Sequence, residues 1–190
     1  MNAAKRKRAA PRRKAAATPA ARKPLASNAA PQAAAHPAIT LGSEVPEFTL
    51  PATGGGSWRL SDARGRKLVL YFYPRDNTPG CTLEGQQFAA LAERFARAGV
   101  RIAGISRDSV AAHEKFREKM GFPFPLLSDT DGAVCGQFDV IREKNMYGRK
   151  VIGIERSTFL IDAAGKLRRE WRKVKVDGHA LEVLEAAKAL

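Results

Sequence analysis

The 190-residue sequence predicts a mixed α/β fold, with a central sheet flanked by helices on both faces. Residues 68–73 and 100–106 are apolar runs of strand length, which suit a sheet that is buried on both sides. A helical pattern follows each run. Two strand signals around a turn and a last helical pattern then end the chain, which indicates a mixed sheet rather than a purely parallel one.

The first 38 residues are predicted to lie outside this fold as a disordered basic tail, with one folded domain over residues 39–190. Nine of the 33 Lys and Arg residues, and no Asp or Glu, fall in the first 40 positions. A segment of Ala, Pro, Lys and Arg buries too little to offset its ordering entropy. Its basic clusters fit nucleic-acid binding through phosphates, a nuclear or organellar address, or a merely solubilising role.

The elements of the domain follow in order. A Thr-Gly-Gly-Gly turn at 53–56 predicts a hairpin of residues 48–50 and 57–60. After the strand at 68–73, a helix is expected over 79–98, because apolar residues recur at helical spacing and Gly99 can end it. These apolar residues are Leu83, Phe88, Leu91 and Phe95.

The second half continues from the strand at 100–106. We expect a helix, a short strand and a short helix, then a hairpin and a final helix. Their ranges are 109–120, 125–127, 132–138, 157–161 with 166–171, and 178–190. A mixed sheet in this order is the thioredoxin-like layout.

The most informative stretch is YFYPRDNTPGCT, residues 71–82, at the junction of a buried strand and a helix. Thr78 can act as N-cap and Pro79 as first helical residue, which places Cys81 in the first turn. Free backbone N–H groups and the helix dipole stabilise a thiolate there. Thioredoxin-type enzymes have C-x-x-C at this junction, whereas this chain has Thr78-x-x-Cys81, so it retains one activated thiolate.

The pattern P-x-x-x-T-x-x-C, formed by Pro74, Thr78 and Cys81, resembles the peroxiredoxin signature. Further segments are similar to the Q-type group, which includes bacterioferritin comigratory protein. They are YFYPRDNTPGCTLE, AGISRDSVAAHEKF, FPFPLLSD, GIERSTFLID and WRKVKVDGHALEVL. The resemblance runs from about Leu41 to the last residue and leaves the tail out.

This resemblance implies thiol-dependent reduction of hydrogen peroxide or organic hydroperoxides, with Cys81 becoming a sulfenic acid. It implies that Thr78, backbone N–H groups and Arg156 hold the peroxide oxygens and stabilise developing charge. Pro74 would shield the thiolate from water. Glu84, one turn after Cys81, either orients Arg156 by ion pairing or is an ordinary solvated helix residue.

The chain departs from the family at the second, resolving cysteine. Many Q-type members carry it five residues after the first, where this chain has Gln86, and others carry it in the next helix, which has no cysteine here. Cys135 is interpreted as a small buried residue. We therefore expect a 1-Cys enzyme, reduced by glutathione, glutaredoxin or thioredoxin, or through a disulfide between two chains.

Other features limit the remaining classes. No cofactor is expected, and His36, His113 and His179 lack a metal-site spacing, although His179 suits a helix start. No apolar run is long enough to span a membrane, and two cysteines fit a reducing, cytoplasmic compartment. We expect a monomer or weak dimer. A thiol-based redox sensor, and a nucleic-acid-associated protector that uses the tail, remain alternative functions.

Overall fold

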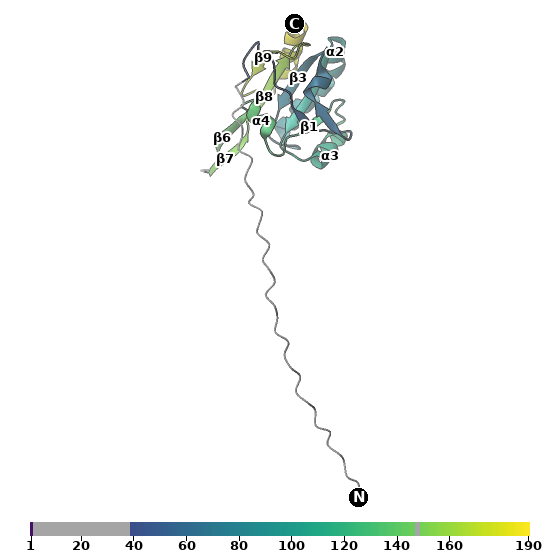
Figure 1. Cartoon of the computed structure of the whole chain (residues 1–190), viewed down its shortest axis with the longest axis vertical. Coiled ribbons are helices and arrows are strands. Elements are labelled where there is room, and N and C mark those ends of the chain that lie inside the picture. Colours follow the sequence, from purple (N-terminus) through teal and green to yellow (C-terminus); the bar gives the residue numbers. More distant parts are fainter. Residues whose placement is uncertain (2–38, 147–148) are drawn as a thin grey trace, which may run out of the picture. The chain divides into compact units, whose positions relative to one another are not determined.

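The folded part is built on a five-stranded mixed sheet with the order β5-β4-β3-β8-β9 (Figure 1). The computed structural model describes Met1, residues 39–146 and residues 149–190, so the predicted tail lies outside the described residues. Central β3 (Lys67–Phe72) pairs in parallel with β4 (Val100–Ser106) and antiparallel with β8 (Ser157–Ile161). At the edges lie β5 (Leu126–Ser128) and β9 (Leu167–Trp171). The prediction of a mixed sheet is confirmed.

The hydrophobic core has two halves, one on each side of strand β3, because successive side chains of a strand point to opposite faces of the sheet. We call these the α1 face and the α4 face, after the helices that cover them. On the α1 face β3 and the residue after it place Val69, Tyr71 and Tyr73. On the α4 face β3 places Leu68, Leu70 and Phe72. All six side chains are at most 1% exposed, so the prediction of a strand buried on both faces is confirmed.

Helices cover the α1 face, and a smaller set of elements covers the α4 face. The α1 face packs against α1 (Pro79–Ala90), α2 (Ala92–Arg97), α3 (Val110–Met120) and α5 (His179–Lys188). The α4 face packs against β1 (Thr49–Pro51), β2 (Ser57–Arg59), the 3-10 turn η1 (Leu60–Ala63) and α4 (Ala133–Gln137). Strands and helices that were predicted agree with these bounds to within two residues, with one exception.

The exception is the helix expected over residues 79–98, which is two helices interrupted at Leu91. Phe88 and Phe95 are fully buried as predicted, but Leu83 is 45% exposed. The buried face of α1 starts instead with Cys81 and Glu84. Its inner face therefore begins with a thiol and a carboxylate, which an apolar pattern does not predict.

A second hairpin, β6 (Ile141–Met146) with β7 (Arg149–Ile154), is paired only within itself among the described residues. No strand was predicted here. The sequence IREKN…RKVIGI has charged residues where a half-buried strand would alternate apolar and polar ones, so the pattern gave no signal. The register runs from Ile141 opposite Ile154 to Met146 opposite Arg149.

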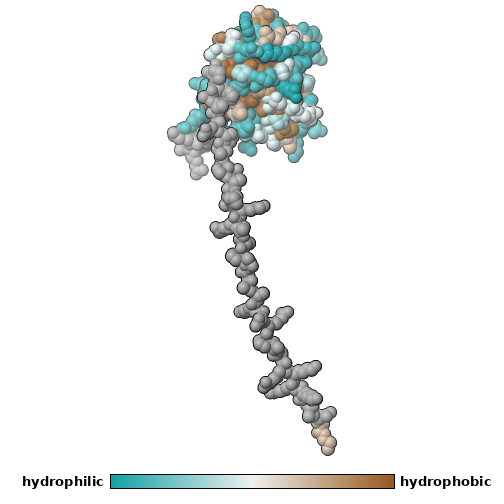
Figure 2. Space-filling model, viewed as in Figure 1, coloured by the Kyte–Doolittle hydropathy of each residue, from teal (hydrophilic) through white to brown (hydrophobic). Residues whose placement is uncertain are grey.

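On the face that Figure 2 shows, hydrophilic residues form most of the folded part, and hydrophobic residues show between them. Within the described ranges, no helix is long and apolar enough to cross a membrane.

Two glycines provide a matched test of how tightly the α1 face is packed. A Cβ at Gly104 in β4 would lie 2.6 Å from the ring of Tyr71, whereas a Cβ at Gly136 in α4 would meet nothing within 4 Å. We predict that Gly104→Ala lowers the free energy of unfolding by about 1–3 kcal/mol through overpacking. Gly136→Ala should leave it unchanged or raise it by up to about 1 kcal/mol. Urea denaturation measures both, and equal effects would contradict this packing.

Candidate active site

Cys81 lies in the first turn of α1, at the end of the loop that leaves β3, and is 2% exposed. Thr78 is the N-cap residue, with the extended backbone of that position, and Pro79 follows it in the first turn. The Thr78 hydroxyl makes no capping bond, however, and instead donates to the carbonyl of Arg75 at 3.1 Å. The predicted placement of Cys81 and Thr78 is confirmed, while the cap is formed without the side chain.

Arg156 contacts the sulfur of Cys81 from the neighbouring strand. Its Nη2 donates to Cys81 Sγ at 3.4 Å, and its Nη1 pairs with Glu84 Oε2. The two segments are 75 residues apart in sequence, but Ser157 pairs with Phe72, so Arg156 lies beside the loop that follows β3. One guanidinium thus bridges the thiol and the carboxylate.

Gly80 leaves room for this bridge. A Cβ at Gly80 would lie 3.2 Å from Arg156 Nη2, which is closer than most real Cβ contacts. The guanidinium therefore lies against the backbone of the first turn of α1. The positive charge of the guanidinium therefore lies at the same end of α1 as the free backbone N–H groups of its first turn.

Glu84 is buried rather than solvated, with a side chain that is 1% exposed. Burial raises the pKa of its carboxyl to about 7, and the charge and hydrogen bond of Arg156 work against that rise. Its second oxygen, Oε1, is buried without a hydrogen-bond partner among the described residues. The site therefore holds a carboxyl that can exchange its proton near neutral pH.

The other thiol lies on the opposite side of the sheet. Cys81 packs in the core of the α1 face and Cys135 in the core of the α4 face. Burial, together with the neighbouring carboxylate of Asp129, raises the pKa of the Cys135 thiol far above its ordinary value. The interpretation of Cys135 as a small buried residue is confirmed.

Pro74 and the histidines, which the sequence analysis also considered, lie at different places in the fold. Pro74 lies in an exposed part of the loop before α1, and its shielding role stays a prediction. His179 begins α5 as predicted, and its Nε2 contacts Thr158 Oγ1 at 2.8 Å. Burial lowers the pKa of His179 to about 4. Within the described residues, no cluster of His, Cys, Asp and Glu could hold a metal ion.

Sequence comparison agrees with this geometry. Residues 41–170 match the model of the AhpC/TSA family. The chain belongs to that family. It is 55% identical over 143 residues to peroxiredoxin Bcp of Xanthomonas campestris, a match that covers 75% of this chain and 89% of that protein.

Solved structures give the same result. A structure of the bacterioferritin comigratory protein of X. campestris is 55% identical, with a TM-score of 0.72. One of peroxiredoxin Q from the same organism is 56% identical, also with a TM-score of 0.72. Each match covers 75% of this chain and 90% of the other. The Q-type resemblance and the thioredoxin-like fold are confirmed, and the protein is a thiol peroxidase that acts on a peroxide with a thiol reductant.

The buried carboxyl of this peroxiredoxin makes its stability depend on pH. The unfolded chain releases the Glu84 proton near pH 4.5, whereas the folded protein keeps it until about pH 7. Between these values the folded state binds more protons, so a rise in pH destabilises wild type relative to Glu84→Gln. We predict a relative loss on the order of 1–3 kcal/mol, at about 1.4 kcal/mol per pKa unit. Urea denaturation at pH 5 and pH 8 measures it, and parallel pH profiles would contradict it.

Proposed function

We propose that Cys81 is the peroxidatic nucleophile and that the enzyme works by a 1-Cys cycle with an external thiol. The Cys81 thiolate attacks one oxygen of the hydroperoxide, forming an S–O bond while the O–O bond breaks. The departing oxygen leaves as water or an alcohol after it takes up a proton, and Cys81 becomes a sulfenic acid. The contact of Arg156 Nη2 with Cys81 Sγ is the observation that carries this assignment.

The roles of the neighbouring groups follow from their places around the sulfur. Arg156 and the N–H groups of the first turn of α1 can stabilise the negative charge that develops on the departing oxygen. Glu84 limits the freedom of the Arg156 side chain through its ion pair, and so orients it. We assign Thr78 to the peroxide oxygens and Pro74 to shielding, on the family signature alone.

The separation of the two thiols supports the 1-Cys cycle. An intramolecular disulfide needs Cα atoms within about 7 Å of each other. Cys81 and Cys135 pack in cores on opposite faces of the central sheet, so a disulfide between them requires at least one of the two segments to leave its core. The sulfenic acid of Cys81 would then be reduced by glutathione, glutaredoxin or thioredoxin, or by a disulfide between chains.

The proposed substrate class draws on a related protein, and the cellular setting on the cysteine content. The related X. campestris protein is described by its alkyl peroxide reduction activity, which favours organic hydroperoxides beside hydrogen peroxide. A reducing, cytoplasmic compartment stays a prediction from the low cysteine content of the chain. A monomer or weak dimer, and nucleic-acid binding by residues 1–38, stay predictions. The redox-sensor alternative predicts no sustained turnover.

Exchange of each thiol tests the cycle. We predict that Cys81→Ser abolishes peroxide consumption, because the other thiol, Cys135, is fully buried beside the Asp129 carboxylate, and both effects raise its pKa. Cys135→Ser should keep most of the turnover with glutathione, glutaredoxin or thioredoxin as reductant. Peroxide consumption with each reductant measures both variants. Loss of turnover in Cys135→Ser with thioredoxin would identify Cys135 as the resolving residue instead.

Removal of the bridging cation tests the role of Arg156. We predict that Arg156→Ala lowers the second-order rate constant for peroxide by about 10²-fold or more, the scale for losing one preorganised electrostatic group. Arg156→Lys should lower the rate constant less than Arg156→Ala, because lysine keeps the positive charge. It should still lower it, because the lysine ammonium group lacks the two-pronged guanidinium that contacts both Glu84 and Cys81. Arg94→Ala, which breaks an exposed ion pair with Glu185, is the control. A rate for Arg156→Ala equal to that control would exclude the assignment.

A further inference from the structure

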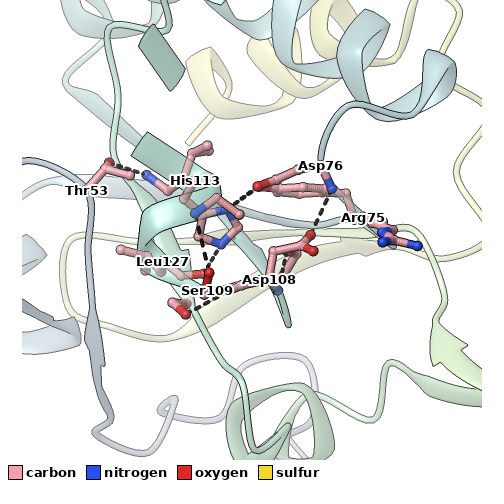
Figure 3. A network of polar contacts seen from close by, with 12 residues as sticks. Thr53, Arg75, Asp76, Asp108, Ser109, His113 and Leu127 are labelled. Atoms are coloured by element: carbon pink, nitrogen blue, oxygen red, sulfur yellow. Dashed lines mark hydrogen bonds and ion pairs between the residues drawn. The ribbon is translucent and has the colours of Figure 1, made fainter. Parts of the chain in front are cut away.

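A buried polar cluster anchors the loop that leads from β3 to Cys81 (Figure 3). Asp76 lies in this loop, and its side chain is 4% exposed. Its Oδ1 accepts a hydrogen bond from the Tyr73 hydroxyl at 2.8 Å, and its Oδ2 lies 2.8 Å from Nδ1 of His113. His113 belongs to α3 and is fully buried, so the pair ties the loop to a separate helix.

The other ring nitrogen of His113 also faces an acceptor. His113 Nε2 lies 3.2 Å from the carbonyl oxygen of Leu127 in β5. The Asp76 carboxyl group and the Leu127 carbonyl thus lie at opposite nitrogens of one ring. His113 therefore links the loop before α1 to β5 through one contact at each ring nitrogen.

The main chain of the loop is held as well. The N–H of Asp76 donates to Asp108 Oδ2 at 2.8 Å. Asp108 is itself fixed by the Ser106 hydroxyl at 2.9 Å, and its carbonyl accepts from the Ser128 hydroxyl at 2.6 Å. Both the side chain and the backbone of Asp76 are thus fixed by elements outside the loop.

The loop needs such an anchor, because its own backbone is not regular. Asn77, next to Asp76, has φ of +57°, a left-handed conformation that is uncommon outside glycine. Thr78 follows as N-cap, and Cys81 lies in the turn that this cap begins. A shift at Asp76 therefore moves the start of α1 relative to Arg156, which is held by a different strand.

We propose that Asp76 and His113 are positioning residues of the peroxidase, whose buried contact fixes the start of α1, and with it the Cys81 thiolate, against Arg156. This inference rests on the proposed role of Cys81. Neither side chain touches the sulfur in the described contacts, so both act through the loop. A misplacement of about 1 Å in a reacting group can cost about 10²-fold in rate.

Two conservative replacements of His113 separate positioning from general packing. The side-chain nitrogen of asparagine can occupy the place of Nδ1, and that of glutamine the place of Nε2. His113→Asn therefore keeps a donor toward Asp76, and His113→Gln keeps one toward Leu127. Each variant loses the contacts of one ring nitrogen, so a merely structural role predicts similar rates for the two.

The test measures sulfenic acid formation in the full chain, after rapid mixing of reduced protein with hydrogen peroxide and trapping with dimedone. We expect His113→Gln and Asp76→Ala to lose about 10-fold or more in the second-order rate constant, and His113→Asn to lose less than about 3-fold. Thermal unfolding of each variant shows that the fold is retained. If His113→Asn and His113→Gln lose rate equally, or His113→Gln keeps the wild-type rate, the proposal is wrong. A wild-type protein that forms no sulfenic acid would instead overturn the proposed function.

Discussion

The central constraint in this structure is that strand β3 is buried on both faces and ends at the loop that leads to Cys81. Successive side chains of β3 point to opposite faces of the sheet, and the core residues around β3 divide between these two faces. Cys81, the proposed peroxidatic residue, lies on the face covered by α1. The second thiol lies on the face covered by α4. The proposed cycle, which uses only Cys81 and an outside reductant, rests on this arrangement.

The site combines charges that are costly to bury. Arg156 contacts both Glu84 and Cys81, and one oxygen of Glu84 has no hydrogen-bond partner among the described residues. Buried charges are stable only when they are paired. The Arg156 fork supplies that pairing for the carboxylate and also reaches the sulfur. Burial of the Glu84 carboxyl raises its pKa to about 7, and this shift makes the stability of the protein depend on pH.

Local signals in the sequence predicted the mixed sheet and the place of Cys81, because Thr78-Pro79 marks a helix start and residues 68–73 form an apolar run. Three features escaped prediction. The break at Leu91 lies within an uninterrupted apolar pattern, and the β6–β7 hairpin lacks alternation. The Asp76–His113 pair joins residues 37 positions apart, and only tertiary packing brings them together. Contacts between residues far apart in the chain produce no periodic pattern in a single sequence, so they cannot be predicted from it.

The fate of the two thiols after one oxidation tests the central claim most directly. Reduced full-length protein is treated with one equivalent of hydrogen peroxide in the absence of any thiol, labelled with dimedone, and analysed by mass spectrometry of its peptides. The account predicts a dimedone adduct on Cys81 and an unmodified thiol at Cys135. A disulfide between Cys81 and Cys135 within one chain would contradict it, because at least one of the two thiols would then have to leave its core during turnover.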